Sequence, residues 1–223
     1  VSLPSGAISR GIRPEHIALV ASASYGLSTV AKNVVCKKGQ DIVVVQDEFP
    51  SNYYCWKKLS EEKGLNLIIV SPDEGAENRV ESWNANLLNA IGENTALVSL
   101  EHAHWMDGSL FDLRAITDKC KRYGTYTVVD GTQSVGMLDI NVEDLGLDAL
   151  VCAGYKWLMG PYSMGFAYFS ERLMNGTPIE ENWISREGSH HFAELTDYTE
   201  NYRPGAIRYD VGETSNFILV PMF

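Results

Sequence analysis

Short apolar runs alternate with helix-like segments along most of this chain, and this alternation limits the possible fold more than any other feature of the sequence. Most of the runs are continuously apolar, which is typical of strands that are covered on both faces. We therefore predict seven strands, at residues 16–22, 41–46, 65–70, 95–100, 125–130, 148–153 and 163–169.

Helix-like segments follow the first four runs, at residues 24–34, 56–64, 80–92 and 113–124. Gly64, Gly92 and Gly124 stand at the ends of three of them as expected C-caps, and Asp112 is the expected N-cap of the last. Strands and helices in this order predict a parallel sheet with helices on its faces.

The last two runs form an exception to the parallel order. Only the nine residues GYKWLMGPY (154–162) separate them, which is too short for a helical crossover, so we expect this pair to be antiparallel. Residues 176–210 are polar and loop-like. The sequence therefore predicts one α/β unit with a seven-stranded, mostly parallel sheet and one antiparallel strand.

Charge and cysteine content exclude several classes of function. The chain carries 18 basic and 29 acidic side chains, a net charge of −11, so we expect no nucleic-acid or membrane partner. No apolar run approaches the ~18 residues that span a bilayer. The four cysteines form no CxxC pair, and we interpret them as reduced, largely buried thiols of a cytoplasmic protein without a metal site: Cys36, Cys55, Cys120 and Cys152.

Chemically versatile side chains gather just after the predicted strands. Ligands of open parallel sheets bind beyond the carboxyl ends of the strands, so these segments should share one edge. They are ASASYG (21–26), DEFPSN (47–52), EHAHWMDG (101–108), Asp130 with GTQS (131–134), and AGYKW (153–157).

Lys156 and Asp130 are the strongest candidates at this edge. A lysine amine can form a Schiff base with a carbonyl cofactor, and a carboxylate can pair with the nitrogen of a pyridinium ring. The plain alternatives are a solvated loop lysine and an Asp that forms a turn before Gly131. His102 and His104 lie two residues apart without a third ligand, so we expect satisfied or site-lining histidines rather than a metal site.

Three serines, Ser22, Ser24 and Ser28, lie at the first strand-to-helix junction. Free N–H groups and the positive end of a helix dipole make such a junction suitable for phosphate. A serine there can also serve as a simple N-cap, and the two roles are compatible.

The segment TVVDGTQS…DALVCAGYKWLMGPYSMGFAYF resembles the lysine segment of class V aminotransferases, which are fold-type I enzymes that use pyridoxal 5′-phosphate (PLP). This group includes cysteine desulfurases, selenocysteine lyase-like and isopenicillin-N-epimerase-like proteins. SASYG, DEFPSN, HWMDG and RYDVGETSN are also similar to it. The resemblance implies the three-layer large domain of these enzymes over residues 1–223, with the N-terminal segment and the C-terminal small domain missing.

The resemblance also implies roles for single residues. Lys156 would form the Schiff base and move protons, Asp130 would hold the ring nitrogen, and Gln133 would contact the phenolic oxygen. Ser24 with the backbone of Ala23 and Tyr25 would hold the phosphate. Further residues at cofactor positions of the family are Phe49, which would stack on the ring, Trp105, Tyr155 and Thr214.

Several positions depart from the desulfurase pattern. Phe49 and Trp105 stand where desulfurases carry His and Asn, while Ala153 and Tyr155 replace a phosphate-binding hydroxyl and a His. A desulfurase's nucleophilic Cys and the family's carboxylate-binding Arg would lie beyond residue 223. These departures favour the aminotransferase-like or epimerase-like branch.

We therefore expect a PLP-dependent transferase of the class V type that acts on an amino acid or related amine. Desulfurase, selenocysteine lyase or epimerase chemistry is the alternative within the family. A non-catalytic interaction domain is an alternative of another class. A nucleotide-binding Rossmann domain is disfavoured because ASASYG stands where GxGxxG would be required. The resemblance further implies a homodimer in which Thr214, or else Ser215, reaches the partner's cofactor phosphate.

Overall fold

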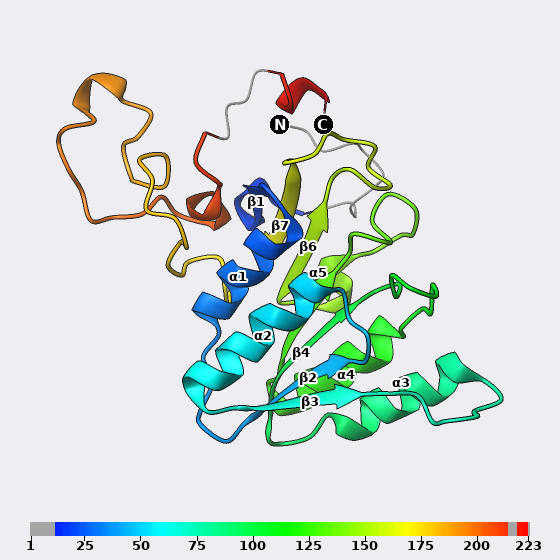
Figure 1. The fold of residues 1–223 in the computed structure, drawn as a ribbon. Coiled ribbons are helices and arrows are strands. Elements are labelled where there is room, and N and C mark those ends of the chain that lie inside the picture. Colours follow the sequence, from blue (N-terminus) through cyan, green and yellow to red (C-terminus); the bar gives the residue numbers. More distant parts are fainter. Residues whose placement is uncertain (1–11, 214–217, 223) are drawn as a thin grey trace.

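Seven strands form a single mixed sheet in the computed structural model, which describes residues 12–213 and 218–222 (Figure 1). Their order is β1-β7-β6-β5-β4-β2-β3. β7 runs antiparallel to both of its neighbours, and the other pairs are parallel, so the predicted sheet is confirmed. The strands are β1 (Ile17–Val20), β2 (Asp41–Val45), β3 (Asn66–Val70), β4 (Thr95–Glu101), β5 (Tyr126–Asp130), β6 (Ala149–Ala153) and β7 (Gly165–Phe169).

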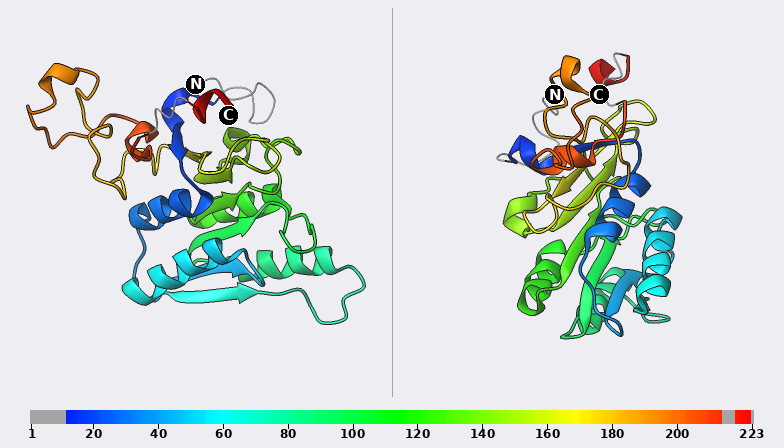
Figure 2. Two further views of the ribbon diagram at one scale, coloured as in Figure 1. Left: turned by 45° about the horizontal axis from the view of Figure 1, so that its top comes forward. Right: turned by 90° about the vertical axis from the view of Figure 1, so that its left-hand side faces the viewer.

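Helices cover both faces of this sheet and give three layers (Figure 2). Leu27 and Trp56, from α1 and α2, are buried with side chains from one face of the sheet. Trp83 and Ile116, from α3 and α4, are buried with side chains from the other face. The helices are α1 (Ala23–Asn33), α2 (Pro50–Lys63), α3 (Arg79–Ala90), α4 (Leu113–Tyr123) and the short α5 (Val142–Leu145).

Most of the expected caps are present. The Asp112 carboxylate accepts a hydrogen bond from the Ala115 N–H at 2.9 Å, and Gly64 and Gly124 end their helices in the left-handed conformation. The prediction for Gly92 was wrong, because α3 stops at Ala90 and the buried, extended Ile91 is its C-cap. The Gly92 N–H instead donates to the Thr95 hydroxyl at 3.0 Å, in the turn that leads into β4.

Two further boundaries differ from the sequence prediction. α2 begins at Pro50, not at residue 56, because Pro at the first helical position has its φ preset and needs no N–H partner. α5 was not predicted. It is one turn long and is capped by the Asn141 side chain, which accepts from the Asp144 N–H at 2.9 Å.

The third strand is less covered than its apolar sequence suggested. β3 lies at the edge of the sheet, where Ile68 and Ile69 are 38 % and 49 % exposed. A continuous apolar run therefore did not indicate full burial in this strand.

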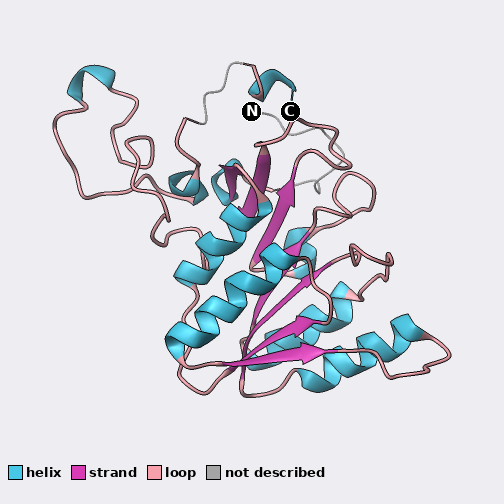
Figure 3. Cartoon of the chain, in the orientation of Figure 1, coloured by secondary structure: helices cyan, strands magenta, loops and turns pink. Residues whose placement is uncertain are grey.

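The stretch after β7 is loop-like, as predicted. It leaves the sheet in a long excursion that Figure 3 shows mainly as loop, with the 3₁₀ helices η2 (Phe192–Glu194) and η3 (Ala206–Tyr209). The chain returns to β1, where the Leu19 N–H donates to Asp210 at 2.8 Å and the Val211 N–H donates to the Leu19 carbonyl at 2.9 Å. The remaining 3₁₀ helices are η1 (Pro14–His16) and η4 (Val220–Met222). Among the described residues, no helix has the length and apolar character needed to span a bilayer.

Candidate active site

The carboxyl ends of β5 and β6 bring the two strongest candidates to one edge of the sheet. Asp130 is the last residue of β5, and Lys156 follows three residues after the end of the adjacent strand β6. Burial and the charge of Asp130 raise the pKa of Glu101, at the end of β4, while the positive charge of Lys156 acts to lower it. The lysine amine therefore lies within electrostatic range of the carboxyl groups at this edge.

Asp130 is almost fully buried, with 3 % of its surface exposed. Its Oδ1 accepts a hydrogen bond from the Thr132 N–H at 2.9 Å, which is the turn contact expected of an Asp in this position. Burial raises the pKa of its carboxyl group above the usual value. Asp130 is thus both a turn former and a buried acid, and an ionised carboxylate here would be stabilised by a cationic partner.

Lys156 lies in the tight turn between β6 and β7 and is exposed. A hydrogen bond from the Gly160 N–H to the Gly154 carbonyl, at 2.9 Å, closes this turn, and Met159 adopts a positive φ of 54° within it. The Tyr155 ring stacks on Tyr162 at a centroid distance of 4.2 Å, and the Lys156 Nζ lies 5.9 Å from the Tyr155 ring centroid. The turn therefore presents a solvent-accessible amine beside a fixed pair of tyrosines.

Two buried carboxyl groups that were given no role from the sequence join Asp130. Glu101 is its direct register partner on β4, and Glu48 follows the end of β2. Burial and the charge of Asp130 raise the pKa of Glu101 to about 8. Burial, together with the charges of Glu101 and Asp130, raises the pKa of Glu48 well above its usual value. The signal in the sequence was an acidic residue at or shortly after the end of each of two apolar strands.

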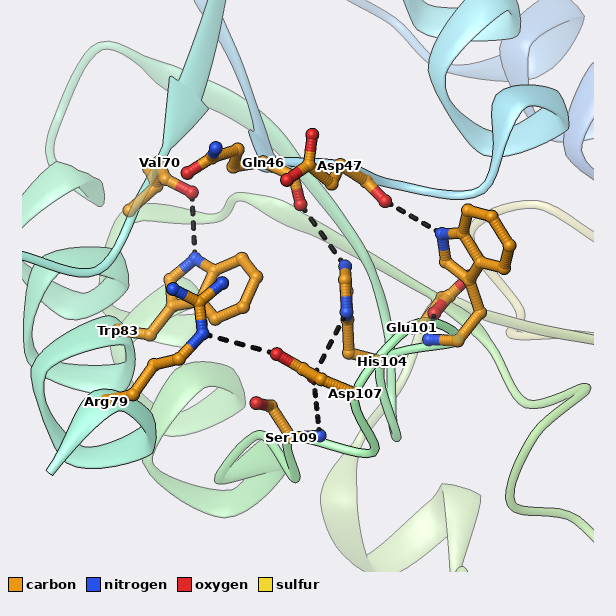
Figure 4. A network of polar contacts seen from close by, with 10 residues as sticks. Gln46, Asp47, Val70, Arg79, Trp83, Glu101, His104, Asp107 and Ser109 are labelled. Atoms are coloured by element: carbon orange, nitrogen blue, oxygen red, sulfur yellow. Dashed lines mark hydrogen bonds and ion pairs between the residues drawn. The ribbon is translucent and has the colours of Figure 1, made fainter.

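Two aromatic rings stand over the same edge. Phe49 and Trp105 meet edge to face, with centroids 5.5 Å apart and planes at 88°, and they remain 39 % and 41 % exposed. The Trp105 indole N–H donates to the Asp47 carbonyl at 2.7 Å (Figure 4). These partly exposed rings offer apolar faces against which a flat group could pack.

The two histidines have different surroundings. His104 is buried and belongs to the network of Figure 4: its Nδ1 lies 3.2 Å from Asp107 and its Nε2 lies 3.2 Å from the Gln46 carbonyl. It therefore holds the loop after β4 against the end of β2. The Nδ1 of His102 is buried and has no hydrogen-bond partner among the described residues, and burial lowers the pKa of its ring.

The start of α1 supplies a possible anion site. Ser22 is its N-cap and accepts a hydrogen bond from the Tyr25 N–H at 3.1 Å, while the Ser22 and Ser24 hydroxyls are 2.9 Å apart. The Tyr25 N–H is thus already occupied, but those of Ala23 and Ser24 belong to the first turn, where no intrahelical partner exists. Ser28 is exposed one turn further along the helix.

Of the remaining predicted residues, Gln133 and Ala153 both lie beside Thr132. Gln133 is half-buried in the turn after β5, next to Thr132. Ala153 ends β6, and its N–H donates to the Thr132 hydroxyl at 3.0 Å. Thr214 and Ser215 lie outside the described residues. As far as Gly212, this loop contacts its own chain, because the Gly212 N–H and the Tyr25 hydroxyl both donate to Glu180, at 2.8 and 3.0 Å.

The arrangement fits a flat, anionic cofactor with a cationic ring nitrogen. It combines a buried carboxylate, two aromatic rings, a helix N-terminus and an accessible amine around one sheet edge. A mixed α/β sheet of this kind is found in fold-type I PLP enzymes.

Residues 11–191 match the sequence profile of the aminotransferase class V family, and the chain belongs to this family. Enzymes of this family are PLP-dependent, so the cofactor predicted from the sequence, pyridoxal 5′-phosphate, is confirmed at the level of the family. The family also includes lyases and epimerases, so membership does not choose among their reactions.

Curated relatives span several of these reactions. Isopenicillin N epimerase of Amycolatopsis lactamdurans is 28 % identical over 72 % of this chain and 41 % of its own length. Cysteine desulfurase of Synechococcus elongatus is 27 % identical over 89 % of the chain and 30 % of its own length. A probable cysteine desulfurase of Pyrococcus abyssi is 31 % identical over 75 % of the chain and 43 % of its own length. The chain therefore spans less than half of each of these relatives.

Solved structures agree on the fold. The cystine C-S lyase C-DES, in complex with its product cysteine persulfide, has a TM-score of 0.76 at 23 % identity. This comparison covers 90 % of the present chain and 52 % of the lyase chain. An apo cysteine desulfurase from Thermococcus onnurineus has a TM-score of 0.73, also at 23 % identity.

Proposed function

We propose that this chain forms the PLP-binding part of an enzyme that breaks a bond at the α-carbon of an amino acid or related amine, with Lys156 as the cofactor lysine. The observation that carries the proposal is the pairing of a buried acid, Asp130, with an accessible amine, Lys156, at the ends of adjacent strands. When bound, PLP supplies an aldehyde that condenses with amines and a ring that withdraws electrons from the α-carbon.

Each residue then has a physical task. The Asp130 carboxylate holds a proton on the ring nitrogen, because an ion pair in a buried site stabilises both charges. Phe49 packs against the ring face and transfers no proton, since its side chain has no titratable group. The N–H groups at the start of α1 and the Ser24 hydroxyl bind the phosphate. The Lys156 amine holds and moves the proton at the substrate's α-carbon.

A class V transferase or epimerase is the reaction type that the site residues favour. Phe49, Ala153, Tyr155 and Trp105 all depart from the desulfurase pattern described above. The four thiols of this chain are also unsuited to nucleophilic attack. Burial raises the pKa of every one of them, that of Cys55 to about 12 and that of Cys120 to about 11, so little thiolate forms near neutral pH.

Cysteine desulfurase is the second candidate, because several relatives at 27–31 % identity carry that name. It would require a nucleophilic cysteine that does not belong to these 223 residues. Release of sulfide from cysteine by the full-length protein would favour this candidate. Formation of a keto acid, or inversion of an amino acid, would favour the first.

Borohydride reduction of the PLP-loaded protein tests the shared part of both candidates. We expect the reduced cofactor to be attached to Lys156 in peptide maps, and to be lost in Lys156→Ala. A matched control is Lys119→Ala, a lysine on α4. Variants that lose the borohydride label should also lose the exchange of the amino-acid α-hydrogen in D₂O. A label on another lysine, or protein that takes up no cofactor, would support the non-catalytic alternative.

A further inference from the structure

One buried carboxyl group connects the two loops that carry the aromatic rings. Glu101 lies at the end of β4, and its Oε2 accepts a hydrogen bond from the Trp105 N–H at 2.5 Å. The Phe49 N–H also lies close enough to favour the charged form of Glu101 and thereby acts to lower its pKa. Glu101 therefore interacts with the main chain of the loop after β2 and holds the loop after β4 by a hydrogen bond.

Trp105 has a second anchor on the first of these loops. Its indole N–H donates to the carbonyl of Asp47, a residue with an unusual positive φ of 53° (Figure 4). With both N–H groups engaged, the indole is held edge to face against Phe49. Without Glu101, the backbone of Trp105 would lose its contact with the sheet edge and only the indole contact would remain.

We propose that Glu101 is a positioning residue of this site: it fastens the backbone at Phe49 and Trp105 and thereby fixes the two rings that flank the cofactor space beside Asp130. The proposal rests on the proposed function for the identity of the cofactor. The contacts of Glu101 are formed within this chain and do not depend on the cofactor. Glu101 is 2 % exposed, so it acts through these two residues and not by direct access from solvent.

Glu48 is the third buried carboxyl group at this sheet edge, together with Asp130 and Glu101. It is 6 % exposed, and among the described residues neither of its oxygens has a hydrogen-bond partner of good geometry. Asn52 can offer only its Nδ2, because its Oδ1 already accepts from Trp56 and Ser99, both at 2.8 Å. A buried carboxylate with so little support is costly, so burial raises the pKa of Glu48 and favours its protonated form. This leaves Glu101 beside Asp130 and Lys156 as the group that binds the two backbone N–H groups.

Amide hydrogen exchange of the cofactor-free, full-length protein tests the proposal independently of PLP. In the parent protein we expect the Trp105 and Phe49 amides to be protected. In Glu101→Gln only one side-chain oxygen remains as an acceptor for the two N–H groups, so we expect at least one of the two amides to exchange at least about tenfold faster. Glu101→Asp keeps the carboxyl group but is too short to reach both loops, so both amides should exchange faster. The matched control is Glu93→Gln, an exposed residue in the turn before β4.

The affinity for PLP is the second readout, measured by absorbance during cofactor titration. We expect Glu101→Gln and Glu101→Asp to bind PLP roughly tenfold more weakly, while borohydride still labels Lys156 and Glu93→Gln behaves as the parent. Unchanged exchange in both Glu101 variants would overturn the proposal, as would an unprotected Trp105 amide in the parent protein, which requires no variant. If the parent binds no PLP but the Glu101 variants still exchange their loop amides faster, the proposed cofactor is wrong and the role of Glu101 in holding the loops is supported.

Discussion

The Thr132 hydroxyl accepts a hydrogen bond from the Ala153 N–H at 3.0 Å, and this contact joins the turn after β5 to the end of β6. Thr132 also donates its own N–H to Asp130. One residue therefore links the loop of the buried acid to the strand that leads to Lys156.

Removal of this hydroxyl should destabilise the protein. Thr132→Val keeps the side-chain shape but leaves the buried Ala153 N–H without an acceptor, and we expect a loss of about 1–3 kcal/mol in the free energy of unfolding. Thr132→Ser retains the hydroxyl and should lose less. Urea denaturation of the two variants checks this expectation. Equal stability of Thr132→Val and the parent would mean that water replaces the hydroxyl.

Asp130→Asn should separate catalysis from stability. The amide keeps the turn contact with the Thr132 N–H through its oxygen, but it cannot stabilise a positive charge on the ring nitrogen. We expect kcat to fall about a hundredfold or more, while borohydride still labels Lys156. Because burial penalises the charged form of Asp130, the melting temperature of the cofactor-free variant should not fall. Near-normal turnover would remove the role given to Asp130.

Much of this architecture could be predicted from the sequence because local patterns determine it. The seven apolar runs gave all seven strands to within about two residues, and Asp112, Gly64 and Gly124 marked helix ends through their own capping chemistry. Lys156 and Asp130 became candidates because Lys156 shortly follows a buried strand and Asp130 ends one.

The features that were missed depend on contacts between distant segments. Glu101 is the last residue of β4 and Glu48 lies in the loop after β2, and the apolar pattern does not indicate that either is buried. The exposure of Ile69 followed from the position of β3 in the strand order, which periodicity does not reveal. Gly92 failed as a C-cap because Ile91 ended the helix by turning into the core.

Gly26 should tolerate no larger residue, because α1 approaches the sheet closely there. A Cβ at this position would lie 2.7 Å from Val151 Cγ1 on β6. Alanine normally favours a helix over glycine by about 1 kcal/mol, but the clash should exceed this gain and give a net loss of about 1–3 kcal/mol. Ser28→Ala, at an exposed site of the same helix, should change stability by less than about 0.5 kcal/mol. An unchanged or raised melting temperature in Gly26→Ala would show that α1 shifts without cost.

The cofactor-free protein should lose stability as the pH rises from about 5 to 8.5. Burial and the charge of Asp130 raise the pKa of Glu101 to about 8, and burial raises that of Asp210 to about 7. In the unfolded chain these groups return to about 4. Between these values the folded state binds more protons than the unfolded state, so the free energy of unfolding falls with rising pH. The stabilising effect is complete below about pH 4 and is lost as the pH passes through the folded-state values.

Thermal unfolding measured from pH 5.5 to 8.5 checks this expectation. Each kcal/mol lost lowers the melting temperature of a domain of this size by about 2–4 °C, so a fall of several degrees is expected. Asp210→Asn keeps the Oδ1 that accepts the Leu19 N–H but removes the titration, and its melting temperature should depend less on pH. Glu93→Gln also removes one negative charge, at an exposed position, and its melting temperature should depend on pH as it does in the parent. A melting temperature that rises over this range would contradict the assignment, because it would require that the unfolded chain bind more protons than the fold.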